Sequence, residues 1–173
     1  MAEVHVQSIA TSQQLQIRPA TASDLQPLAE IWLEMMTDHE SRDARFALAP
    51  AAAALWQDQA EELLYKDDAF VLAAEARDGL QGFCVGWVAK NPVIYRLPEV
   101  GFISEIAVRR RAKRHGIGRA LVDAARTWFR QRRLTELQLS TAVWNDEARA
   151  FWQTLGGHPL LVRYHFDLTT TGG

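Results

Sequence analysis

The stretch from Phe102 to Leu121, FISEIAVRRRAKRHGIGRAL, decides the fold, and it combines three local patterns. Residues 102–108 are rich in β-branched side chains and predict a strand. Residues 109–115 form a basic turn. From Ile117 onward the apolar residues recur every three or four positions, which is typical of a helix. The stretch therefore predicts a strand that leads through a glycine-containing loop into a helix.

The start of this helix is suited to bind an anion. The first N–H groups of a helix have no partner within the helix, and the helix dipole is positive at that end. Gly116 and Gly118 have no Cβ atoms where a phosphate group would touch the backbone. Lys113, Arg114 and Arg119 add positive charge around the same point. The expected ligand is a diphosphate, although the spacing matches neither a P-loop nor the three-glycine dinucleotide motif. A glycine pair without a ligand is the alternative.

Length and composition indicate a globular protein. The 173 residues suffice for one domain with a core, and 48% of them are hydrophobic. The net charge of −2 argues against a nucleic-acid partner. No membrane span or signal peptide is visible, so we expect no membrane partner and a cytoplasmic location. Cys84 is the single cysteine, which excludes an intramolecular disulfide, and no cluster has the spacing of metal ligands, so no metal is expected.

The other elements follow from hydrophobic periodicity and turn residues. The polar residues 1–14 predict a flexible N-terminal extension. A first helix is expected to begin with Ser23 as its N-cap and to end near Asp38 and His39. The remaining predicted elements are strands at 15–18, 69–76, 82–90, 135–142 and 160–168, and helices at 51–65 and 145–155.

Two motifs resemble signatures of the GNAT superfamily, the acyl-CoA-dependent N-acyltransferases. Residues 113–118, KRHGIG, resemble its Arg/Gln-x-x-Gly-x-Gly/Ala loop, with Lys in the first position. Residues 145–157, NDEARAFWQTLGG, resemble its Asn-x-x-Ala-x-x-Phe-Tyr-x-x-x-Gly-Phe/Ala helix. The two motifs occur in the family's order with one strand between them. The first half of the chain fits the family in element order only.

The resemblance implies the fold and the cosubstrate. Residues 15–173 would form a single N-acetyltransferase domain of the α/β (α+β) class, with a mixed, mostly antiparallel central sheet flanked by helices. Acetyl-CoA would be the cosubstrate, with its pyrophosphate on the loop and its thioester and pantetheine arm on the backbone N–H groups of residues 106–108. The residues implied to bind it are Ile106, Ala107, Val108, Lys113, Arg114, His115, Gly116, Ile117, Gly118, Arg119, Ala120, Asn145, Ala148 and Trp152.

The resemblance also suggests catalytic residues. Glu105 is the expected base, because it directly precedes the thioester-binding segment and an amine of pKa about 10 arrives protonated. A structural carboxylate that pairs with a cation or faces solvent is the alternative. Many family members carry a Tyr, which protonates the departing thiolate, where this chain has Trp152. Tyr164, or water, would then act as the acid.

The expected reaction is direct transfer of an acetyl group to an amine of a small molecule. A protein or peptide N-acetyltransferase and a non-catalytic acyl-CoA-binding module are the alternatives. Family members form one wall of the acceptor pocket from the connection between the first two helices, here with Asp38, His39, Asp43, Arg45 and Phe46, although a solvated loop is equally consistent. Dimers are frequent in the family, and the last strand is where a homodimer contact is expected. The basic residues 109–114 would contact coenzyme A in part and otherwise form a solvated face.

Overall fold

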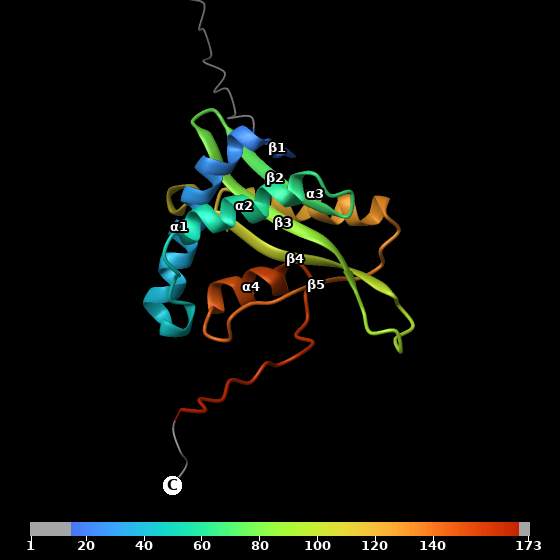
Figure 1. The fold of residues 1–173 in the computed structure, drawn as a ribbon. Coiled ribbons are helices and arrows are strands. Elements are labelled where there is room, and N and C mark those ends of the chain that lie inside the picture. The colour runs from blue at the N-terminus through green and yellow to red at the C-terminus, as the bar shows by residue number, and fades with distance from the viewer. Residues whose placement is uncertain (1–14, 170–173) are drawn as a thin grey trace, which may run out of the picture. The chain divides into compact units, whose positions relative to one another are not determined.

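The computed structural model describes residues 15–169, and the chain divides into two compact units, residues 1–140 and residues 141–173. The flexible extension predicted for residues 1–14 lies outside the described residues. The single domain predicted for residues 15–173 stays a prediction. The sheet and the first three α-helices belong to the first unit (Figure 1).

Five strands form one sheet in the first unit. They are β1 Gln16–Pro19, β2 Ala69–Ala76, β3 Gly79–Lys90, β4 Glu99–Val108 and β5 Leu137–Leu139. Their order is β1-β2-β3-β4-β5, with antiparallel neighbours from β1 to β4 and a parallel pair between β4 and β5. The predicted mixed, mostly antiparallel sheet is therefore confirmed. β3 begins earlier than predicted, because the β2–β3 turn needs only the two residues between Ala76 and Gly79.

Helices cover both faces of this sheet (Figure 1). The α-helices of the first unit are α1 Leu25–Arg42, α2 Ala52–Leu64 and α3 Ile117–Gln131, and short 3₁₀ turns span Ala22–Asp24, Ala44–Phe46 and Arg110–Ala112. Leu28 of α1 and Trp56 of α2 share one buried cluster with Val71 and Phe83 of the sheet. On the opposite face, Phe129 of α3 packs edge-on against Phe70, with ring centroids 5.4 Å apart.

The start and end of α1 differ from the prediction. Asp24 rather than Ser23 precedes the helix, because the Asp24 carboxylate accepts the backbone N–H of Thr21 at 2.8 Å and closes a 3₁₀ turn there. At the other end α1 continues to Arg42 instead of stopping near Asp38. Arg42 forms an ion pair with Asp38 one turn earlier, at 3.1 Å, which supports the added turn.

The second unit contains one α-helix, α4 Asp146–Thr154, among its described residues. Asn145 caps this helix, and its side-chain oxygen accepts the backbone N–H of Ala148 at 3.1 Å. The last strand predicted for residues 160–168 is wrong, because these residues adopt neither helix nor strand. Their alternating pattern lacks a partner backbone within the described residues, and a strand is stabilised by its cross-strand neighbours rather than by its own composition.

Candidate functional site

The loop between β4 and α3 has the backbone geometry that an anion site needs. Gly116 is the N-cap of α3 and adopts a left-handed conformation with φ +80°, which glycine accepts without strain. No side chain caps this end of the helix, and the first intrahelical acceptor is the Gly116 carbonyl, which accepts the Ala120 N–H at 3.0 Å. The N–H groups of Ile117, Gly118 and Arg119 precede that bond. They therefore form a positive helix end of the kind that binds phosphate.

The edge of β4 that leads to this loop lacks a neighbouring strand. The β4–β5 pairing ends at Ile103 and Leu139, whereas β4 continues to Val108. Within the part of the chain that the structure describes, no strand pairs with residues 104–108 on the β5 side. The backbone polar groups on that side are therefore available to an extended ligand. The segment predicted to bind the thioester, residues 106–108, lies on this open edge.

A β-bulge in β4 turns Glu105 toward α1 and α2. Val85 pairs with Glu105 but its neighbour Gly86 pairs with Ile103, so Ser104 is an extra residue in β4. Gly101 lies on the α3 face, where an added Cβ would meet the Phe129 ring at 2.8 Å. Without the extra residue, Glu105 would share this face, because strand side chains alternate with period two. The bulge therefore reverses the alternation between Gly101 and Glu105.

Two tryptophans hold the Glu105 carboxylate. The indole N–H of Trp32 on α1 donates to Oε1 at 3.0 Å, and the indole N–H of Trp56 on α2 donates to Oε2 at 2.7 Å. Both rings are buried, with 7% and 5% of their surface exposed, and they stack at a centroid distance of 5.9 Å. The alternative of a carboxylate paired with a cation is not observed, because none of the ion pairs within residues 15–169 involves Glu105.

Sequence reasoning missed both tryptophans. Trp32 lies on the apolar face of its helix and gives the signal of an ordinary core residue. Trp32 and Trp56 are separated from Glu105 by 73 and 49 residues. Only the packing of two helices over one strand brings the three side chains together. A buried indole N–H needs an acceptor, and this requirement is the one signal that could have linked the tryptophans to a carboxylate.

Part of the basic run has a structural role. Arg109, 17% exposed, donates to Glu30 at 3.2 Å and to Glu34 at 3.1 Å on α1. Its Nε also donates to the Leu80 carbonyl at 3.1 Å. Arg109 therefore fastens α1 to the ends of β3 and β4 instead of presenting a free cation. His115 follows in the loop, where its ring nitrogen lies 3.4 Å from the Ala112 carbonyl oxygen.

The residues predicted to contact an acceptor lie at the end of α1 and in the 3₁₀ turn that follows it. Asp43 caps that turn and accepts Arg45 at 2.6 Å, while Asp38 pairs with Arg42. The ring of His39 packs against Phe46 at a centroid distance of 5.5 Å, and its Nδ1 lies 2.8 Å from the Met35 carbonyl oxygen. Many of these side chains therefore pair or pack with one another.

The predicted site residues of the second unit lie in and before α4 and in the segment that follows it. Ala148 and Trp152 lie on α4, and the Trp152 ring packs against Phe151 at a centroid distance of 5.0 Å. Tyr164 belongs to the segment that forms no strand, and 78% of its surface is exposed. The roles assigned to Asn145, Ala148, Trp152 and Tyr164 stay predictions.

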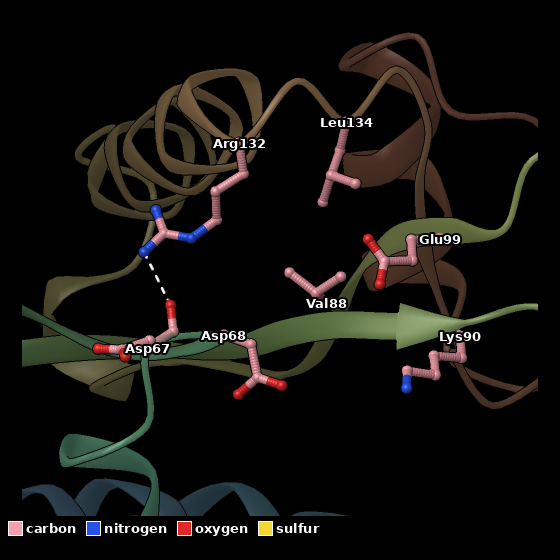
Figure 2. A pocket seen from close by; sticks show the side chains of 7 residues that line it. All are labelled: Asp67, Asp68, Val88, Lys90, Glu99, Arg132 and Leu134. Atoms are coloured by element: carbon pink, nitrogen blue, oxygen red, sulfur yellow. Dashed lines mark hydrogen bonds between the residues drawn. The ribbon is translucent and has the colours of Figure 1, made fainter.

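The first unit has one hollow beside the glycine loop and another at the far end of β4. The larger, about 870 Å³, lies between α1 and residues 109–111, directly before the glycine loop. The smaller, about 260 Å³, is shown in Figure 2 and lies at the start of β4, with Glu99 on its wall. There Arg132 donates to the Asp67 carbonyl at 2.9 Å and stacks 3.4 Å above the Trp128 ring. β4 extends about 3.3 Å per residue, so the smaller hollow and the glycine loop lie at opposite ends of this strand.

Two features are absent from residues 15–169, a metal site and a membrane-spanning helix. No group of three or more His, Cys, Asp or Glu side chains there is arranged to hold a metal ion. None of the described helices combines the length and apolar character needed to cross a membrane.

The comparisons with known proteins identify a family and a fold. A family model described as Acetyltransferase (GNAT) family matches residues 29–156, whereas a search of curated proteins finds no match. The solved aminoglycoside N-acetyltransferase AAC(6')-Iy in complex with CoA is 17% identical, with TM-score 0.75 over 93% of this chain and 99% of that chain. Aminoglycoside antibiotic 6'-N-acetyltransferase AAC(6')-IG from Acinetobacter haemolyticus is 21% identical, with TM-score 0.71 over 88% and 97%.

A tetramutant of the BH1408 protein from Bacillus halodurans is also similar, at 17% identity and TM-score 0.76, over 88% of this chain and 99% of that chain. At such identities these structures show a common fold and nothing finer. The family model, by contrast, covers well over half of the chain. The chain therefore belongs to the GNAT family of acetyltransferases.

Proposed function

We propose that this protein transfers an acetyl group from acetyl-CoA directly to an amine of a small molecule. The observation that carries the proposal is one continuous run of chain, residues 104–119. This run begins with the open edge of β4, which includes Glu105, and ends with the start of α3, which no side chain caps. Such a run offers a binding surface for an extended phosphate-bearing donor directly beside a carboxylate.

The donor would lie along β4 with its pyrophosphate at the start of α3. The N–H groups of residues 117–119 would donate to the phosphate oxygens, and Lys113 and Arg114 would add charge-assisted bonds. Backbone N–H groups of residues 106–108 would hold the pantetheine arm and polarise the thioester carbonyl. One such donor aimed at a developing oxyanion contributes roughly 3 kcal/mol in comparable sites.

The chemistry needs a base at the amine. In the proposed reaction, Glu105 takes a proton from the acceptor ammonium, either directly or through a water. The neutral nitrogen then attacks the thioester carbonyl carbon, the C–N bond forms, and the C–S bond breaks. The electron pair of that bond leaves with sulfur as the coenzyme A thiolate, which takes a proton from Tyr164 or from water. The products are an acetamide and coenzyme A.

Direct transfer is favoured over an acyl-enzyme. The only thiol of the chain belongs to Cys84, which is fully buried in β3. Burial raises the pKa of the Cys84 thiol, and the nearby Glu105 carboxylate raises it further. A thiol that stays protonated at neutral pH is a poor nucleophile, so Cys84 is not a candidate to carry the acetyl group.

The proposed acceptor is a small cationic amine. The similar solved structures include several aminoglycoside N-acetyltransferases, which supports a small-molecule acceptor. A peptide acceptor is the second candidate, and a non-catalytic acyl-CoA-binding module is the third because Trp152 occupies the position of the family's acidic Tyr.

A thiol-release screen separates these candidates. Purified protein with acetyl-CoA would be tested against polyamines, amino acids, aminoglycosides and a panel of peptides. We expect free thiol with at least one small amine. Release with peptides alone would favour the peptide reading, and coenzyme A binding without any turnover would favour the binding module.

Donor binding has a separate test by calorimetry with coenzyme A. The double charge reversal Lys113→Glu/Arg114→Glu should weaken binding by roughly a hundredfold or more, because each of the two lost charge-assisted bonds contributes about 1.5–3 kcal/mol. The matched control Arg130→Glu/Arg133→Glu changes the same number of charges at the other end of α3 and should leave the affinity unchanged. Equal affinities of the two variants would remove the glycine loop from the proposed donor site.

Homodimerisation is also a proposal. The segment expected to mediate it carries large exposed apolar side chains at Leu161, Phe166 and Leu168, which a second copy of this segment would cover. Light scattering on the full chain should give a dimer mass, and Leu161→Lys/Phe166→Lys should give the monomer mass. A monomeric wild-type chain at micromolar concentration would contradict the proposal.

A further inference from the structure

We propose that Trp32 and Trp56 are positioning residues, which fix the Glu105 carboxylate for proton transfer and leave its negative charge for the acceptor ammonium. This inference rests on the proposed function, in which Glu105 is the base. Each carboxylate oxygen accepts one indole N–H, at 3.0 Å from Trp32 and 2.7 Å from Trp56. The carboxylate therefore has two fixed points and a defined plane.

The two donors are themselves fixed. Trp32 and Trp56 are almost fully buried, and the two rings stack at an interplanar angle of 25°. Trp56 also packs against Phe83 of β3 at a centroid distance of 5.2 Å. Because the rings come from different helices and are locked by core packing, neither N–H can turn away without moving α1 or α2. The carboxylate is therefore held by two side chains that the core keeps in place.

The neutrality of the donors carries the functional part of the inference. An indole N–H donates a hydrogen bond but adds no positive charge. Within the described residues no arginine, lysine or histidine forms an ion pair with Glu105. An ionised carboxylate offers about four acceptor positions, and the two indoles use two of them. Positions and charge are left for an ammonium group or for a bridging water.

A purely structural role makes different predictions. If Glu105 only satisfied two buried indole N–H groups, losing either indole would lower thermal stability without changing the turnover of the folded protein. If the indoles position the base, their loss lowers kcat while the KM for acetyl-CoA stays constant, because the donor site lies elsewhere on β4 and α3. A misplaced catalytic group typically costs up to about a hundredfold in rate.

The variants Trp32→Phe and Trp56→Phe keep an aromatic ring and remove the N–H. Trp128→Phe is the matched control, because Trp128 packs against Phe70 on the α3 side of the sheet and is no part of the site. At a temperature well below the unfolding midpoints, we expect kcat to fall by about tenfold or more in each of the first two variants. The control should stay within twofold of wild type, and all three should keep the wild-type KM for acetyl-CoA.

NMR spectroscopy tests the two hydrogen bonds to Glu105 without measuring enzyme activity. Protein labelled with ¹⁵N at its six indoles gives six N–H signals, and the Trp32→Phe and Trp56→Phe variants identify two of them by their absence. Replacing the carboxylate by Glu105→Gln should shift both of these signals and leave the Trp128 signal in place. Unmoved signals would show that the indoles do not donate to Glu105 in solution, which would overturn the inference.

The failure of this inference is distinguishable from the failure of the proposed function. Unchanged turnover in Glu105→Gln would remove Glu105 as the base and with it the proposed mechanism. A loss of turnover in Glu105→Gln, with wild-type kcat in both Trp32→Phe and Trp56→Phe, would keep the base and overturn only the positioning role. A loss in all three, with the control unaffected, is the result we expect.

Discussion

Asp24 and Glu105 are both hydrogen-bonded carboxylates, but the side chains that donate N–H bonds to them differ in charge. Asp24 accepts two bonds from the Arg18 guanidinium, at 2.7 Å and 2.9 Å, in addition to those from Thr21. Glu105 receives one bond from each of two indoles. The first carboxylate therefore has a counter-ion at hydrogen-bond distance, and the second has none among the described residues.

The difference shows how one chain uses the same functional group in two ways. At Asp24 the hydrogen bonds from Arg18 lower the pKa of the carboxylate to about 2, and the same pair raises the pKa of Arg18. The ion pair between Arg18 and Asp24 neutralises both charges and stabilises the junction of β1 with α1. At Glu105 two hydrogen bonds fix the carboxylate, but no cation pairs with it among the described residues. A partly buried carboxylate without a counter-ion stabilises a fold poorly, whereas it is well suited to bind a cation.

The largest expected effect comes from Glu105→Gln, which removes the uncompensated charge and keeps the side-chain shape. If Glu105 is the base, kcat should fall by at least about a hundredfold, the lower range for general base catalysis. Steady-state kinetics and thermal unfolding measured on the same preparation check this. A variant that loses stability but retains kcat would place Glu105 with Asp24 as a structural carboxylate.

The second prediction concerns Asp24→Ala, which leaves Arg18 with one carboxylate partner instead of two. Breaking a largely buried pair should lower the free energy of unfolding by about 3 kcal/mol. Urea unfolding measures this loss. The kcat of the remaining folded protein should stay at the wild-type value, and a large fall in kcat would contradict the separation of the two carboxylates into structural and functional.

The third prediction uses pH to separate the two carboxylates. The pKa of Asp24 is lower in the folded chain, at about 2, than its value of about 3.9 in an unfolded chain. The stabilisation is therefore fully present above about pH 4 and is lost as pH falls through about 2. The lowered pKa of Asp24 contributes about 2–3 kcal/mol to the free energy of unfolding, and Asp24→Ala should lack this part of the acid dependence. Urea unfolding between pH 2 and pH 6 tests it, and parallel curves for the two proteins would refute it.

The smallest expected effect comes from Glu75→Ala, which removes the second partner of Arg18. Glu75 accepts Arg18 at 2.7 Å, but 43% of its side chain is exposed, so solvent screens the pair. The loss in the free energy of unfolding should stay below about 1 kcal/mol. A loss as large as that of Asp24→Ala would mean that burial does not govern the strength of these ion pairs.

Local patterns predicted the elements because their causes are local. The β2–β3 hairpin, the start of α3 at Ile117 and the cap of α4 by Asn145 each depend on residues a few positions apart. The strand predicted at residues 160–168 failed because a strand also depends on a partner backbone, which composition does not supply. The same reason explains why β5 is limited to Leu137–Leu139.

The sequence alone determined that a glycine-bearing loop precedes a helix and that Glu105 lies in the strand that leads to that loop, and its resemblance to the family implied a mixed sheet flanked by helices. Tertiary structure alone decided which way Glu105 faces and what holds it. The extra residue Ser104 reverses the face of the strand, and the packing of α1 and α2 brings Trp32 and Trp56 to the carboxylate. Neither property is encoded within a short window, because a bulge is defined by the neighbouring strand and a hydrogen bond by the distance between groups far apart in the chain.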